Sequence, residues 1–98
     1  MEATEVVLGQ LVRSISGRDG NRYFLVLKAL DQKHVLIADG LYRKVENPKK
    51  KKLKHLLLID SVAEEIGEML HKGKTPTNAQ AASAVQRMLE TLELGSSN

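Results

Sequence analysis

The chain has 98 residues, enough for one small domain and too few for two full-sized hydrophobic cores. It contains no cysteine, which excludes disulfides, cysteine-based zinc sites and thiol nucleophiles, and its formal net charge is +3. Residues 1–55 hold 12 basic and 6 acidic residues, a local charge of +6, whereas residues 56–98 hold 3 basic and 6 acidic residues, or −3. This asymmetry predicts a binding face for a polyanion.

The first half of the chain has the pattern of short strands separated by turns. Apolar stretches predict strands at residues 8–15, 23–30, 34–38, 41–45 and 53–59. Turn-forming residues predict the intervening loops at residues 16–21, 31–33 and 39–40. Five short antiparallel strands favour a small β-barrel, closed or half-closed, because closure removes exposed sheet edges.

A cationic segment lies between the fourth and fifth predicted strands. Seven of the fifteen Lys and Arg residues fall within residues 43–55, where Glu46 is the only acidic residue. Pro48 interrupts the strand pattern, and four consecutive lysines, Lys49–Lys52, follow it. We expect these lysines to form a solvated loop, because four adjacent like charges repel each other.

The second half of the chain predicts two helices. Ser61 and Glu64 form a capping-box pattern, and apolar residues then recur at helical spacing until Gly73, which predicts a helix at residues 61–72. Thr77 and Gln80 form a second capping box, which predicts a helix at residues 78–94. The expected organisation is a barrel at residues 6–59, followed by a helical segment at residues 60–94, in a mainly β fold.

A strand, loop and strand unit begins at Gly9 and has Gly17-Arg18-Asp19 in its loop, with Arg22 just after it. Through residue 45 it resembles the KOW motif of several ribosomal large-subunit proteins and transcription elongation factors. With residues 43–56 added, the chain is similar to small bacterial KOW-domain RNA-binding proteins related to the eukaryotic and archaeal ribosomal class. Asn21 stands where the motif has its second loop glycine, and Asn is the residue best able to replace glycine at positive φ.

This resemblance implies an SH3-like five-stranded barrel whose first loop contacts RNA. With the cationic segment, the expected RNA-binding residues are Arg13, Arg18, Asn21, Arg22, Arg43, Lys44, Lys49, Lys50, Lys51, Lys52, Lys54 and His55. The lysines would dock on phosphates while the arginine loop sets the register. The predicted function is non-catalytic binding of structured ribosomal RNA as part of the translation apparatus. We expect the protein to be cytoplasmic, to need no cofactor and to be monomeric when free.

The aromatic residues are few and add little to this prediction. Phe24 is expected in the core, and Tyr23 and Tyr42 are interpreted as packing residues, although either could stack on a base. Without an aromatic platform, the sequence favours recognition of RNA by its shape and backbone over reading of single-stranded sequence.

Other interpretations stay open at this point. A protein-interaction adaptor could use the apolar stripe of the helical segment, which comprises Val62, Ile66, Met69, Val85, Met88 and Leu92. Double-stranded DNA is a further possible ligand on charge alone. The three histidines lie in separate predicted elements, so we expect no metal site, and no catalytic constellation can be assembled from the spacing of polar residues.

Overall fold

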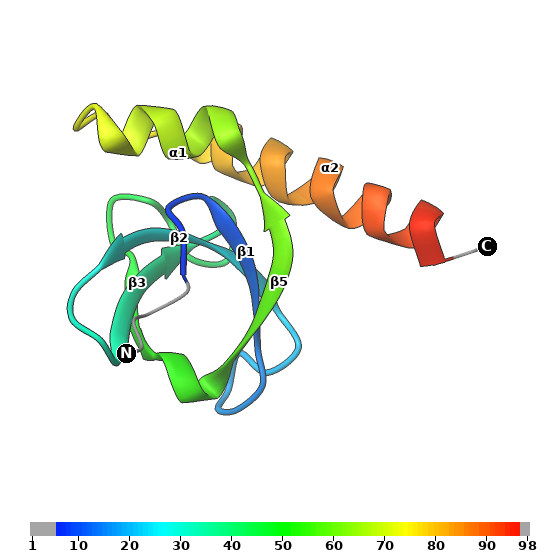
Figure 1. Ribbon diagram of the computed structural model, residues 1–98, viewed down its shortest axis with the longest axis horizontal. Coiled ribbons are helices and arrows are strands. Elements are labelled where there is room, and N and C mark those ends of the chain that lie inside the picture. The colour runs from blue at the N-terminus through cyan, green and yellow to red at the C-terminus, as the bar shows by residue number, and fades with distance from the viewer. Residues whose placement is uncertain (1–5, 97–98) are drawn as a thin grey trace.

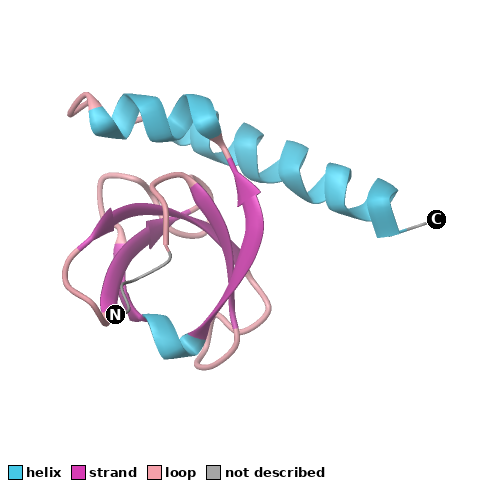
Figure 2. Cartoon of the chain, viewed as in Figure 1, coloured by secondary structure: helices cyan, strands magenta, loops and turns pink. Residues whose placement is uncertain are grey.

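Five strands form one antiparallel sheet in a computed structural model that describes residues 6–96, with side chains described to residue 93. The spatial order is β4-β3-β2-β1-β5. The strands are β1 (Gln10–Ser14), β2 (Tyr23–Ala29), β3 (His34–Ala38), β4 (Lys49–Lys52) and β5 (Leu56–Val62). A short 3-10 helix, η1 (Leu53–His55), joins β4 to β5, and helices α1 (Glu64–His71) and α2 (Asn78–Ser96) follow (Figures 1 and 2). The expected β-rich fold with two C-terminal helices is confirmed.

The central strands of the sheet are buried on both faces. In the pairing of β1 with β2, Leu11 lies opposite Leu25 and Val12 lies opposite Phe24, and all four side chains are fully buried. Successive residues of a strand point to opposite faces, so these two pairs belong to different clusters. The inner cluster comprises Val12, Phe24, Val26, Val35, Ile37 and Leu56, and the sheet curves around it (Figure 2). Phe24 therefore lies in the core, as predicted.

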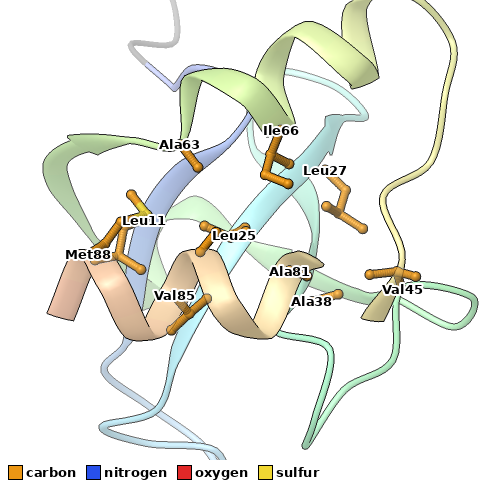
Figure 3. Close-up of a cluster of buried hydrophobic side chains, with 11 residues drawn as sticks. Leu11, Leu25, Leu27, Ala38, Val45, Ala63, Ile66, Ala81, Val85 and Met88 are labelled. Carbon is orange, nitrogen blue, oxygen red and sulfur yellow. The ribbon is translucent and has the colours of Figure 1, made fainter. Parts of the chain in front are cut away.

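The two helices cover the other face of the sheet. Figure 3 shows this helix-side cluster, in which α1 and the residue before it contribute Ile66 and Ala63, and α2 contributes Ala81, Val85 and Met88. From the sheet side it contains Leu11, Leu25, Leu27 and Ala38. Tyr23, half-buried, packs against the same cluster. The helical segment and the strands thus share one hydrophobic core.

Two glycines allow the helices to approach the sheet backbone closely. A Cβ atom at Gly9 would lie 2.7 Å from the Ala63 carbonyl oxygen, and one at Gly40 would lie 2.2 Å from the Asn78 carbonyl oxygen. Both residues also have positive φ, +86° and +81°. Gly9 lies against the start of α1 and Gly40 lies against the start of α2. Glycine is therefore required at both positions.

Two capping boxes and Gly73 predicted where helices begin or end, and two of these three signals are confirmed. At the start of α2 the Gln80 amide donates to Thr77 Oγ1 (3.0 Å) and the Thr77 amide donates to Gln80 Oε1 (2.9 Å), which confirms the second capping box. Gly73, with φ +77°, follows the end of α1. The helix start predicted from the first capping box is wrong, because Ser61 lies in β5 and α1 begins at Glu64. Pairing of β5 with β1 extends to Val62 and replaces the helical start.

The fourth strand is also displaced from its predicted place. Residues 41–45 form turns, because the Asp39 carboxylate accepts hydrogen bonds from the amides of Leu41 (3.0 Å) and Arg43 (2.7 Å). The edge of β3 pairs with Lys49–Lys52 instead. The expectation of a lysine loop is therefore wrong, and the strand predicted at residues 53–59 begins only at Leu56, after η1.

Candidate nucleic-acid interface

The loop between β1 and β2 is held in one conformation by its backbone. Asn21 has φ +71°, so it does take the left-handed conformation expected at this position. Its amide donates to the Ser14 carbonyl (2.7 Å), and the Ser14 amide donates to the Arg22 carbonyl (2.9 Å). The loop therefore closes tightly, with Arg18 exposed between its ends.

Asp19 connects this loop to the edge strand β4. Its side chain is fully buried, and its Oδ1 atom accepts hydrogen bonds from Lys51 Nζ (3.0 Å) and Ser14 Oγ (3.2 Å). Lys49 Nζ lies 3.1 Å from Oδ2, and Lys51 Nζ also donates to the Ser16 carbonyl (3.1 Å). Burial by itself would raise the pKa of Asp19, but the two ammonium groups outweigh it and hold the pKa below its ordinary value.

The four lysines of β4 divide into two pairs with different environments. Lys51 is 8% exposed and Lys49 is 30% exposed, and both face Asp19. Lys50 and Lys52 are exposed on the opposite side of the strand. Sequence reasoning missed this division, because it treated the run as a loop. The available signals were the period of two that a strand imposes and the single aspartate in the facing loop.

The outward lysines continue into a basic groove. A groove of about 410 Å³ is lined by Lys33, Lys52 and Lys54, together with Gln32 and Leu53. Within residues 6–93, none of these three lysines forms an ion pair with a carboxylate. Lys33, in the turn between β2 and β3, was not among the predicted binding residues, because a single lysine in a turn is unremarkable in sequence.

The remaining predicted residues have varied environments. Arg13 is half-buried and its Nη1 lies 3.5 Å from Asn21 Oδ1, at the limit for a hydrogen bond. Arg43 Nη1 donates to the Asn47 carbonyl (3.2 Å), and Lys44 is exposed. The Arg22 guanidinium carbon lies 3.8 Å from the centre of the Tyr42 ring. This contact brings the β1–β2 loop against the connection between β3 and β4.

Two of the basic segments lie at the same end of the sheet. The β1–β2 loop and η1 are adjacent at the end away from the helices (Figure 1), and the Ile15 amide donates to the His55 carbonyl (3.0 Å). Half-buried His55 and exposed Lys54 therefore adjoin the loop that carries Arg18. The lysine strand touches the same loop through Asp19, so the structure brings both predicted halves of the site into contact.

Lysines on an edge strand have an alternative role that needs no ligand. An edge strand presents unpaired backbone groups, and charged side chains there discourage edge-to-edge association with other chains. This role accounts for Lys50 and Lys52, but it does not account for the other two lysines of the groove, Lys33 and Lys54, or for exposed Arg18 in the loop.

Within residues 6–96, no cluster of three or more His, Asp or Glu side chains could hold a metal ion. In the same range, no helix is long and apolar enough to cross a membrane.

No protein-family model matches the sequence, and comparison with curated proteins finds no significant match.

Proposed function

We propose that this protein binds structured RNA through its basic end, as a non-catalytic, cytoplasmic component of the translation apparatus. The observation that carries the proposal is a set of exposed cations that form no ion pair with a carboxylate within residues 6–93: Lys33, Lys52 and Lys54 of the groove and Lys50 of β4. The loop that adjoins η1 adds exposed Arg18. Binding of such cations to a phosphate backbone is favourable, because it releases the counterions condensed on the nucleic acid. The helices bury the other face of the sheet and leave this end accessible.

The resemblance to KOW-domain proteins supports RNA as the polyanion. Five antiparallel strands in a strongly curved sheet are compatible with the SH3-like barrel that this family implies. The arginine loop after the first strand also occupies the position at which the resemblance expects RNA contacts. Exposed arginine adds a planar group that can bind a phosphate with two hydrogen bonds.

The adaptor alternative receives less support from the packing of the helices. Ile66, Val85 and Met88, three of the six residues of the proposed stripe, are buried against the sheet and are not available to a partner. Met69 is half-buried. Val62 and Leu92 stay exposed, but scattered exposed apolar residues are normal on a protein surface. RNA binding is therefore the function to test first.

The first experiment measures the affinity for a fluorescently labelled RNA hairpin as a function of salt. On the order of 4–7 phosphate contacts should give a log–log slope of roughly −3 to −6. The double variant Lys50→Ala/Lys52→Ala should lower the magnitude of this slope by about 1–2 and weaken binding about tenfold at moderate salt. The matched control is Lys72→Ala/Lys74→Ala, which removes the same charge from exposed positions after α1.

The proposal fails if affinity is insensitive to salt, or if both double variants weaken binding equally. Competition with duplex DNA of the same length tests the choice of RNA, because only RNA carries the 2′-hydroxyl group. Crosslinking in cells followed by RNA sequencing tests the link to translation. A footprint on ribosomal RNA supports it, and scattered sites on messenger or transfer RNA contradict it.

A further inference from the structure

Tyr42 is an aromatic side chain that stays partly exposed although it contacts the core. Its side chain is 47% exposed, although its ring centre lies 6.4 Å from that of fully buried Phe24, at an interplanar angle of 54°. The turn that carries it is fixed, because Asp39 binds the amides of Leu41 and Arg43 on either side. The ring is thus anchored to the core and held at the surface in one place.

Arg22 covers the ring from a second segment of the chain. Its guanidinium carbon lies 3.8 Å from the ring centre, a distance typical of a cation–π contact. The Arg22 backbone is fixed at both ends, because its amide donates to the Asp19 carbonyl (3.1 Å) and its carbonyl accepts from the Ser14 amide (2.9 Å). No carboxylate within residues 6–93 forms an ion pair with Arg22, and the side chain is exposed. The Arg22 guanidinium group therefore lies against an aromatic ring and is exposed at the surface.

We infer that Arg22 and Tyr42 form a stacking platform for one unpaired RNA base, which lies on the outer face of the guanidinium group. Unpaired bases in RNA stack on aromatic rings and on arginine planes, whereas a base inside a duplex already has both faces covered by its neighbours. The ligand is then a structured RNA with an extruded nucleotide, such as a bulge. This inference rests on the proposed RNA-binding function, and it adds reading of a base to recognition by shape and backbone.

The neighbouring groups suit the nucleotide that such a base would belong to. Arg18 and Asn21 come from the same loop as Arg22, and both are exposed. A base on the platform would place its own phosphates near this loop, where a cation and an amide can bind them. Arginine binds a phosphate through the edge of its guanidinium plane, so the face of Arg22 away from Tyr42 stays available for stacking on a base.

Three RNA hairpins of identical stem sequence test this inference. The first carries a single bulged nucleotide, the second carries an abasic residue at the bulge, and the third is fully paired. Stacking of one base contributes about 1–3 kcal/mol, so the protein should bind the bulged hairpin about tenfold more tightly than the abasic one. Recognition of backbone shape alone predicts equal affinity for the bulged and abasic hairpins.

Three variants separate stacking from charge. Arg22→Lys keeps the positive charge but loses the plane, and Tyr42→Leu keeps apolar bulk but loses the ring, so both should reduce the preference for the base to less than about twofold. Tyr42→Phe keeps the ring and should retain the full preference. Lys50→Ala should weaken binding of all three hairpins by the same factor and leave the ratio between them unchanged. Circular dichroism checks that each variant is folded.

The outcomes distinguish the two proposals. If the wild-type protein binds all three hairpins with equal affinity, or if Tyr42→Leu and Arg22→Lys keep the tenfold preference, the stacking platform is refuted while RNA binding stands. If the protein binds none of the hairpins, the proposed function itself fails.

Discussion

Lys51→Met tests the division of the lysine strand into a structural and a binding pair. The substitution removes the ammonium group that donates to Asp19 and to the Ser16 carbonyl, and it keeps most of the apolar side-chain stem. In the wild type both Lys51 and Asp19 are buried. Lys50→Met, at the adjacent exposed position of the same strand, is the matched control.

The expected loss follows from the burial of Asp19. Removing one partner of a buried ion pair costs about 3–5 kcal/mol, because the other charge is left buried without compensation. Lys49 stays 3.1 Å from the carboxylate but is itself partly exposed, so we expect a loss near the lower end, about 3 kcal/mol. Lys50→Met should change the free energy of unfolding by less than about 0.5 kcal/mol, as surface substitutions usually do.

Urea unfolding at neutral pH, followed by far-ultraviolet circular dichroism, measures both effects. Lys51→Met should shift the midpoint without changing the slope of the transition. Equal destabilisation by the two variants would refute the assignment of alternate lysines to alternate roles. A further check is Asp19→Asn combined with Lys51→Met, which leaves no unpaired carboxylate and should be more stable, by roughly 1 kcal/mol or more, than the sum of the single effects predicts.

Two further predictions concern acid stability and helix docking. Because the pKa of Asp19 is lowered by folding, its contribution to stability is present at neutral pH and is lost as the pH falls below about 4. The difference in unfolding free energy between wild type and Asp19→Asn should therefore shrink in acid, and a constant difference down to about pH 2 would contradict the ion pair. Gly40→Ala should cost about 3 kcal/mol or more in urea unfolding, since it combines positive φ with a clash against α2. Gly73→Ala has positive φ but open space around it and should cost only about 1–2 kcal/mol, so equal losses would show that the contact with α2 is not needed.

The predictions that succeeded depended on short-range chemistry. Asn21 has positive φ, a conformation that asparagine tolerates better than most other residues. The Thr77 and Gln80 pair caps a helix because the two residues reach each other across a single turn. Phe24 is buried because a large apolar ring in a strand is most stable in the core.

The predictions that failed involved a choice between competing hydrogen-bond partners, several of them distant in the chain. Residues 41–45 have a strand-like pattern, but hydrogen bonds to the Asp39 carboxylate hold them in turns. The Val45 amide donates a hydrogen bond to the Asn78 side-chain oxygen (2.8 Å). Residues 49–52 pair with the edge of β3 instead, although four adjacent charges disfavour a buried strand. Ser61 is likewise drawn into β5 by its pairing with β1. Local pattern does not reveal which of two segments pairs with a given edge.

A β-rich first half, a helical second half and a concentration of positive charge can all be predicted from the sequence, because they depend on composition and on neighbours a few residues apart. The environment of each charged side chain, by contrast, depends on the folded chain. Curvature of the sheet brings Asp19 of one loop to Lys51 of the far edge strand, 32 residues away, and so makes two lysines structural. The same curvature brings Arg22 onto Tyr42. Both pairings join segments distant in the chain, and their geometry exists only once the sheet has formed.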